Sequence, residues 1–236
     1  MKIAVITPYY NTPNDWLTTC HESVSAQTHP CTHIFVADGA PQEIVSTFDA
    51  QHIISEANHG DYGDTPRAMG SASAAGQGFD AIAWLDADNW YEPGHIEGLV
   101  KLQQEHGAAI CTSARMLYAL DGSPLGPCHH VDGKKFVDTN CYLLTRAAYH
   151  LFSVWCRIEP PLHAIGDTVL WDAVKRSGLS HHHSSAATLA YRTSFRYHYL
   201  LFGKNVPEGA RDAPDISAAE KVWREHIAER DRQNTN

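Results

Sequence analysis

The chain has no apolar run long enough to cross a membrane and no cluster of basic residues. Among its 236 residues, 18 are Lys or Arg and 27 are Asp or Glu, which gives a formal net charge of -9. A membrane-spanning helix needs about 20 apolar residues, and binding to nucleic acid or anionic lipid needs clustered Lys or Arg. The sequence therefore argues against a transmembrane protein, a nucleic-acid binder and a polybasic membrane anchor.

Cysteine is sparse, and no two cysteines lie close together in the sequence. The six residues are Cys20, Cys31, Cys111, Cys128, Cys141 and Cys156. Residues 1–7 are too short for the apolar part of a signal peptide and are typical of a first strand. We therefore expect free thiols and a cytoplasmic protein rather than a disulfide or zinc framework.

Three common catalytic or nucleotide-binding signatures are also missing. The sequence contains neither a Walker A motif nor a Gly-x-Ser-x-Gly elbow. Residues 76–81 fit the spacing of a glycine-rich dinucleotide loop, but they follow a predicted helix and precede a strand, the reverse of the required order. Kinase, serine hydrolase and dinucleotide-binding functions are thereby disfavoured.

Short apolar segments alternate with amphipathic ones through the first half of the chain. Hydrophobic residues make up 43% of the composition, enough for a sizeable core. The pattern predicts strands over 2–7, 32–38, 52–55, 81–85 and 108–112, and helices over 14–27, 41–48, 64–75 and 93–106. Strands that alternate with helices, without hairpin turns, predict an α/β fold with a mostly parallel central sheet and helices on both faces.

The second half is less regular. Strands are expected over 115–120 and 135–145, and helices over 146–155, 167–176 and 216–230. Val222, Trp223 and Ile227 would dock the last helix on the body. With no repeat and no linker, we predict one domain over 1–236, with a nucleotide-binding half (1–113) and a second half (114–236) that completes a cleft.

Three predicted strands end on polar residues: Thr7, Asp38, and the Asp86–Asp88 pair. Ligands of parallel sheets bind beyond the carboxyl ends of the strands. Two carboxylates one residue apart, directly after a buried strand, suit a divalent cation beside a diphosphate, because Mg²⁺ and Mn²⁺ prefer carboxylate oxygens. The alternative is a helix-capping turn, in which Asp is common.

Four segments, taken in order, resemble the family 2 glycosyltransferases of the GT-A fold. They are Val5–Asn11 with its Pro-x-Tyr-Asn turn, Val36–Ala40, Asn58-His59-Gly60 followed by Arg67 and Gly70, and Trp84–Pro93 with the Asp-x-Asp motif. The second half of the chain matches weakly. The resemblance implies a GT-A-like domain, whose second half binds the acceptor, and a metal-dependent inverting glycosyltransferase.

The same resemblance implies roles for particular residues. Those implied to bind the nucleotide are Thr7, Pro8, Tyr9, Asn11, Asp38, Arg67 and Asp86. Asp88 would ligate Mn²⁺ or Mg²⁺, and His198 would be the late-chain histidine that approaches the metal and diphosphate. Turn packing is the alternative role for Tyr9 and Tyr10, and a surface salt bridge is the alternative for Arg67.

A general base is expected further along the chain, and Asp167 occupies the corresponding place. Family members often carry a Glu-Asp pair there, so Gly166 departs from the pattern. A carboxylate with a pKa near 4 is a weak base, so the site would have to be partly desolvated; a plain helix N-cap is the alternative. Residues 138–140 could reach the sugar or acceptor, and the histidines at 129–130 could line the acceptor pocket. The histidine run at 181–183 is expected to be a solvated or core-edge segment.

We therefore predict a hexosyltransferase-type enzyme that moves a sugar from a nucleotide-sugar, with a UDP-sugar as first choice, to an acceptor hydroxyl. The acceptor would be a glycan, a lipid-linked molecule or a small molecule, and a homodimer stays open. The Gln-x-x-Arg-Trp motif of processive enzymes is absent, which favours single-sugar addition. Two alternatives remain: a GT-A-like protein that binds a nucleotide-sugar without transfer, and, ranked last, a sugar nucleotidyltransferase.

Overall fold

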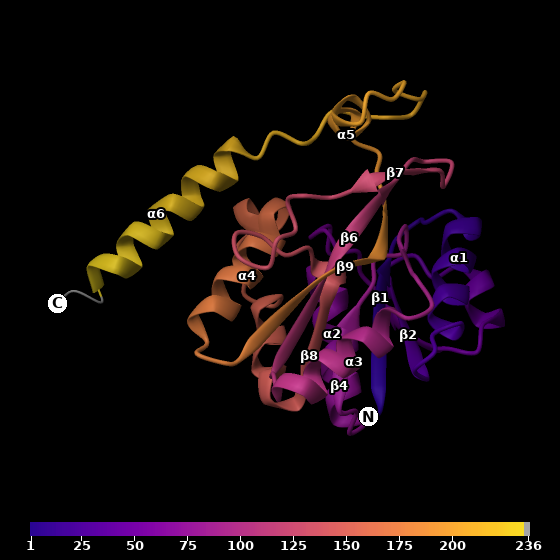
Figure 1. Cartoon of the computed structure of the whole chain (residues 1–236), viewed down its shortest axis with the longest axis horizontal. Helices are drawn as coiled ribbons and strands as arrows, with labels where there is room; N and C mark the ends of the chain where they lie inside the picture. The colour runs from indigo at the N-terminus through magenta and orange to yellow at the C-terminus, as the bar shows by residue number, and fades with distance from the viewer. Residues whose placement is uncertain (234–236) are drawn as a thin grey trace.

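The computed structural model describes residues 1–233, which build a single nine-stranded sheet (Figure 1). The strand order is β3-β2-β1-β4-β8-β6-β9-β5, and β7 pairs with β6. The strands are β1 (Ile3–Tyr9), β2 (Cys31–Asp38), β3 (Gln51–Ser55), β4 (Ala81–Trp84), β5 (Trp90–Tyr91), β6 (Ile110–Tyr118), β7 (Pro124–Pro127), β8 (Tyr142–Thr145) and β9 (His181–Arg192). The predicted α/β fold with a mostly parallel central sheet is confirmed.

The helices connect the strands and cover the sheet. The α-helices are α1 (Asn14–Ser25), α2 (Asp64–Gly76), α3 (His95–His106), α4 (Gly166–Arg176), α5 (Arg196–Leu201) and α6 (Ser217–Gln233). Four 3-10 segments are η1 (Glu43–Thr47), η2 (Thr139–Cys141), η3 (Arg146–Val154) and η4 (Pro160–Ile165). Helix α2 packs on β1 and β2, whereas α3 packs on β6 and β9.

The first half of the sheet is parallel and almost completely buried. Strand β1 lies between β2 and β4, parallel to both, and every residue of β1 and β4 is buried. Helix α2 approaches this sheet closely at Gly70, where an added Cβ would lie 2.5 Å from Ile6 Cγ2. The carboxyl ends of β1, β2 and β4 therefore meet at one edge of the sheet.

The second half mixes strand directions. Strand β8 is antiparallel to both β4 and β6, whereas β9 is parallel to β6. The chain between β6 and β8 contains no crossover helix, so β8 can pair with β6 in the antiparallel sense. The second half thus extends the parallel part of the sheet with strands of mixed direction.

Several predicted elements differ in type or length. The helices expected over 41–48 and 146–155 are 3-10 segments, and the strand expected over 135–145 forms only at its end, as β8. Before β8, the Asp138 side chain accepts a hydrogen bond from the Asn140 backbone N–H at 2.9 Å and turns the chain into η2. Such an Asx turn competes with extended structure.

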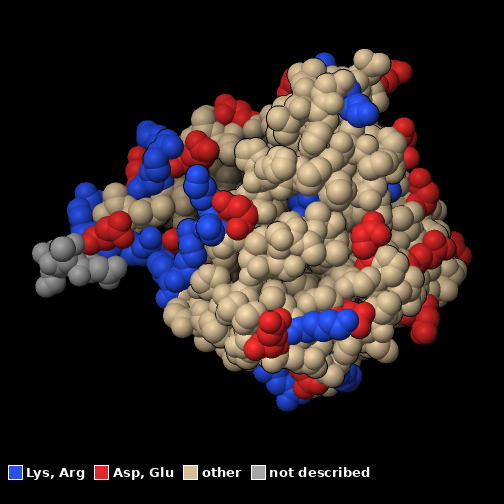
Figure 2. All heavy atoms as spheres, viewed as in Figure 1, with Lys and Arg blue, Asp and Glu red and all other residues tan. Residues whose placement is uncertain are grey.

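Helix α6 lies at the side of the molecule and contacts η4 (Figure 1). Val222 and Trp223 pack partly buried against the core, as predicted. Figure 2 shows Lys and Arg side chains gathered around α6, while acidic side chains are spread over the rest of this face. Within residues 1–233, no helix is both long enough and apolar enough to span a bilayer.

Candidate active site

A pocket of about 700 Å³ lies at the carboxyl ends of β1, β2 and β4. Its wall includes six of the residues singled out in the sequence: Pro8, Tyr9, Asn11, Asp38, Arg67 and Asp86, together with Asp88. Its size is in the range of small-molecule and cofactor sites. We call it the first pocket.

Asp38 ends β2 at the edge of the first pocket, and His59 holds its carboxylate. The His59 imidazole Nδ1 lies 2.6 Å from Asp38 Oδ1, and the His59 backbone N–H donates to both carboxylate oxygens. The turn that carries His59 passes so close that a Cβ at Gly39 would lie 2.5 Å from the Asn58 nitrogen. Gly39 also has φ +80°, so both the close approach and the backbone conformation require glycine there.

Two residues of β1, Thr7 and Tyr9, are expected near the nucleobase, but they occupy different environments. Thr7 is fully buried, does not line the pocket, and its hydroxyl lies 2.8 Å from His33 Nε2. Tyr9 lines the pocket but is only 3% exposed, and its hydroxyl lies 2.7 Å from His52 Nε2. Tyr10 also lines the pocket and is 51% exposed, so its ring, unlike that of Tyr9, is accessible.

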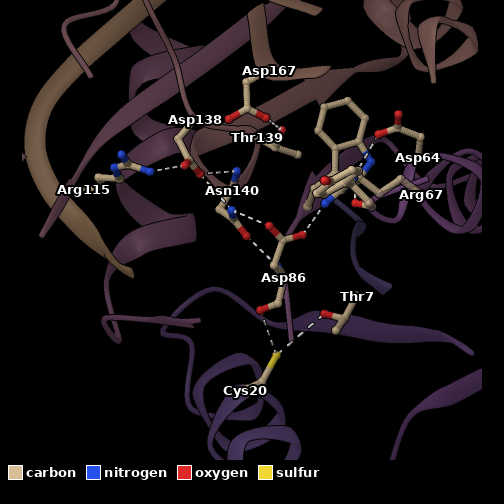
Figure 3. Close-up of polar contacts among 12 residues, drawn as sticks. Thr7, Cys20, Asp64, Arg67, Asp86, Arg115, Asp138, Thr139, Asn140 and Asp167 are labelled. Atoms are coloured by element: carbon tan, nitrogen blue, oxygen red, sulfur yellow. Dashed lines mark hydrogen bonds and ion pairs between the residues drawn. The ribbon is translucent and has the colours of Figure 1, made fainter. Parts of the chain in front are cut away.

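Arg67 and Asp86 form the centre of a buried charged network (Figure 3). Arg67 Nη2 donates to Asp86 Oδ1 at 2.5 Å, and Asn140 Nδ2 donates to Asp86 Oδ2 at 2.9 Å. Asn140 also donates to Asp138, which is paired with Arg115. Arg67 is thus a buried partner of Asp86 and not a surface salt bridge.

Asp88 lines the first pocket without a cationic side chain bound to its carboxylate. Burial, reinforced by the negative charge of Asp86, raises the pKa of Asp88 to about 7. Arg192 is close, but its Nε donates to the Asp88 backbone oxygen at 3.1 Å. A buried carboxylate of this kind fits one ligand position of Mg²⁺ or Mn²⁺, which would offset its charge.

His198 does not join Asp88. It lines a different pocket, and its Nδ1 lies 2.6 Å from the Thr193 hydroxyl. In the described part of the chain, no group of three or more His, Cys, Asp or Glu side chains is placed to hold a metal ion. The structure therefore does not bring the two expected metal ligands together.

A second pocket, of about 550 Å³, adjoins the first. The two share Tyr62, Arg67, Asp86 and Arg211 in their walls. Arg67 Nε and His198 Nε2 are buried in the second wall and have no hydrogen-bond partner within residues 1–233. Buried polar groups are normally paired, so these atoms indicate a wall that binds a polar molecule or water.

Asp167 lies in the second pocket, in the first turn of α4. The Thr139 hydroxyl donates to Asp167 Oδ1 (Figure 3). Burial, followed by the negative charge of Asp138, raises the pKa of Asp167 to about 7 against the lowering effect of Thr139 and Arg67. The partly desolvated environment that a carboxylate base requires is therefore present around Asp167.

The histidines at 129–130 and 181–183, singled out in the sequence, line neither pocket. On β9, His183 Nδ1 lies 2.9 Å from the Thr112 hydroxyl and the His182 ring stacks on His106. This is the solvated, core-edge strand that the sequence favoured. His129 and His130 are absent from both pocket walls.

The sequence assigns no role to many residues of the two walls, among them Asp64, Arg115, Trp155, His163 and Arg211. Arg115 and Trp155 sit in apolar segments that predict a core strand and a helix, and so carry no functional signal. The sequence predicts Asp64 as the first residue of a helix, and Asp64 does begin α2. Only the tertiary structure places these side chains beside Asp86 and Asp167.

The model of the family described as "Glycosyl transferase family 2" matches residues 4–157. The chain belongs to this family. Among solved structures, S. aureus TarS residues 1–349 in complex with UDP is similar with a TM-score of 0.62 and 13% identity, covering 86% of this chain and 63% of that one. The complex of the same TarS segment with UDP-GlcNAc is similar with a TM-score of 0.57 and 12% identity, covering 82% and 59%.

The chain spans only part of these relatives. A longer TarS structure matches with a TM-score of 0.59 and 14% identity, and the aligned region covers 82% of this chain but 37% of that one. At such low identity the likeness establishes the fold. A search of curated proteins found no match. The family match thus assigns the chain to glycosyl transferase family 2, and the structural likeness shows its fold.

Proposed function

We propose that this glycosyltransferase moves a sugar from a UDP-sugar to an acceptor hydroxyl, with metal assistance and inversion at the anomeric carbon. The observation that carries the proposal is the junction of the two pockets at Arg67 and Asp86. One pocket offers a nucleotide-sized space at the strand ends, and the other holds the desolvated carboxylate of Asp167. The TarS complexes with UDP and UDP-GlcNAc support uridine as the first nucleotide to test.

In the first pocket, Asp38 would accept a hydrogen bond from the nucleobase. A uracil imide N–H is a donor that a carboxylate oxygen can accept, and Tyr10 offers an exposed aromatic ring for stacking. Pro8 and Asn11 would border the same base. His59 fixes the orientation of the Asp38 carboxylate by two kinds of contact, through its backbone and its ring.

At the junction, Asp86 would bind the ribose or a metal-bound water, held in place by Arg67 and Asn140. Asp88 would ligate Mn²⁺ or Mg²⁺. When bound there, the cation would supply positive charge opposite the negative charge that grows on the leaving diphosphate. Arg211 lies in both pocket walls, forms no ion pair with a carboxylate of residues 1–233, and would add a second positive charge near the diphosphate.

Asp167 would act as the general base. Its carboxylate takes the proton from the acceptor hydroxyl as the hydroxyl oxygen bonds to the anomeric carbon and the bond to the diphosphate breaks. The pKa near 7 brings its basicity closer to that of an effective catalyst at neutral pH. Thr139 holds one oxygen and so orients the carboxylate.

The proposal is tested by UDP release from UDP-glucose, UDP-galactose, UDP-GlcNAc and UDP-glucuronate, with and without Mn²⁺. The wild-type chain should hydrolyse at least one donor slowly in the absence of acceptor, and Asp167→Asn should bind that donor but release UDP much more slowly. Donor binding without any hydrolysis or transfer would favour the second candidate, a non-catalytic nucleotide-sugar-binding protein, which the glycine at position 166 also suggests.

A further inference from the structure

A buried pair of side chains, Asp64 and His163, lies in the wall of the second pocket and has no part in the proposal above. Asp64 begins α2 with a side chain that is only 2% exposed, while His163 lies in η4 and is 18% exposed. Their contact joins two segments 99 residues apart, with His163 Nδ1 2.7 Å from Asp64 Oδ2. Such a contact fixes the orientation of the imidazole ring.

The pair continues the charged network of the site. Asp64 Oδ1 lies 3.4 Å from Arg67 Nη1, and Arg67 in turn contacts Asp86 (Figure 3). Burial raises the pKa of Asp64 to about 6, against the lowering effect of Arg67 and His163, so Asp64 is mainly ionised at neutral pH. An ionised carboxylate only accepts hydrogen bonds. In the neutral imidazole, donation from Nδ1–H to this carboxylate leaves Nε2 as an acceptor.

The pair also lies beside the proposed base. A Cβ at Gly166 would lie 3.4 Å from Asp64 Oδ1 and 3.2 Å from the Trp155 ring. The position directly before Asp167 thus faces the Asp64 carboxylate at short range. The chain lacks an acidic side chain at 166, and the carboxylate next to that position comes from α2 instead.

We propose that Asp64 and His163 bind a hydroxyl group of the sugar being transferred, with His163 Nε2 as the hydrogen-bond acceptor. This inference rests on the proposed function. The transferred sugar must lie between the diphosphate, near Asp86 and Asp88, and the base Asp167. The pair contacts Arg67 on one side and borders Gly166 on the other, so it flanks that space. Asp64 is the positioning residue, because it acts through the His163 ring.

The test compares the affinity for UDP with the affinity for the UDP-sugar that the wild-type chain binds best, by calorimetric titration with Mn²⁺. The first variant is His163→Phe, which keeps a planar ring but removes the acceptor. It should weaken UDP-sugar binding about fivefold to tenfold, as expected for one lost hydrogen bond, and leave UDP binding within about twofold.

Two further variants keep the test decisive if His163→Phe does not fold. His163→Gln retains an acceptor oxygen and should restore part of the UDP-sugar affinity. In Asp64→Asn, the side-chain amide can donate to Nδ1, which moves the ring proton to Nε2 and removes the acceptor, so UDP-sugar affinity should fall as in His163→Phe. His106→Phe, at a histidine outside both pockets, is the matched control and should change neither affinity.

Selective loss of UDP-sugar affinity supports the inference. Unchanged UDP-sugar affinity in both His163→Phe and Asp64→Asn would overturn it, as would equal loss for UDP and UDP-sugar, which indicates a structural role. If the wild-type chain bound no UDP at all, the proposed function would be wrong. That result differs from normal UDP binding with unchanged UDP-sugar affinity in the variants, which would overturn only the role of Asp64 and His163.

Discussion

The two pockets of this chain are built in different ways. The first pocket takes most of its polar side chains from the ends of neighbouring parallel strands, β1, β2 and β4, and from the turns that follow them. The second draws on segments far apart in the sequence: β6, the turn before η2, η4, the start of α4 and the chain around α5. The comparison teaches that strand ends supply much of the first pocket, whereas the second depends on ion pairs between distant segments.

The largest effect is expected at the junction, from Asp88→Asn. Loss of this carboxylate removes the proposed metal ligand, so transfer should fall by about 1,000-fold or more, and Mn²⁺ should no longer strengthen UDP binding. The measurement is UDP release together with UDP titration in Mn²⁺ and in EDTA. Turnover close to that of the wild-type chain would contradict the assignment of Asp88 as a metal ligand. Asp86 and Asp88 would then have only a structural role in the turn after β4.

Asp167→Asn distinguishes most clearly between the role of the second pocket in transfer and the role of the first pocket in UDP binding. Removal of the base from the second pocket should slow transfer by about 100-fold to 10,000-fold, while the first pocket keeps its affinity for UDP. Steady-state rates and UDP titrations of the same preparation provide both readouts. If transfer persisted, the base would lie elsewhere in the second pocket.

The pH dependence of turnover tests the role of Asp167 in the second pocket. Asp167 must be ionised to accept a proton, and its pKa is raised to about 7, so turnover at saturating donor should rise between pH 6 and pH 8. The rise should disappear in Asp167→Asn. A wild-type rate already constant from pH 5 upwards would contradict the raised pKa of this carboxylate.

The smallest effect is structural and confined to the first pocket. Gly39→Ala should destabilise the fold by about 2 kcal/mol, because φ is +80° there and the Cβ would lie 2.5 Å from the Asn58 nitrogen. Denaturant unfolding measures the loss, and UDP binding should weaken because the turn supports His59 and Asp38. The matched control is Gly76→Ala at the end of α2, where a Cβ has no neighbour within 4 Å and stability should stay the same or rise by up to about 1 kcal/mol. Equal stability of the two variants would contradict the close approach at Gly39.

The first half of the fold was largely predictable because strand periodicity and polar strand ends are local signals. Apolar runs mark β1, β2 and β4, and Asp38 and Asp86 follow from where those runs end. The side-chain roles within β1 were not predictable in the same way. The hydroxyl of Thr7 contacts the buried His33 and that of Tyr9 contacts the partly buried His52, so both hydroxyl groups are already engaged.

The second pocket could not be assembled from the sequence, apart from single residues such as Asp167 and His198. The pairing of Asp64 with His163 spans 99 residues, and that of Arg115 with Asp138 depends on an Asx turn that replaces a predicted strand. These contacts are long-range, and nothing in local propensity or periodicity signals them. The expected link between His198 and the metal fails for the same reason, since the tertiary fold places His198 beside Thr193.

The most direct test of the account is a calorimetric titration of the wild-type chain with UDP, GDP, CDP and dTDP, each in Mn²⁺ and in EDTA. The account predicts tight binding of UDP that requires the metal, with weaker binding of the other nucleotides. No binding of any nucleoside diphosphate by a folded sample would contradict the central claim that the first pocket is a donor site.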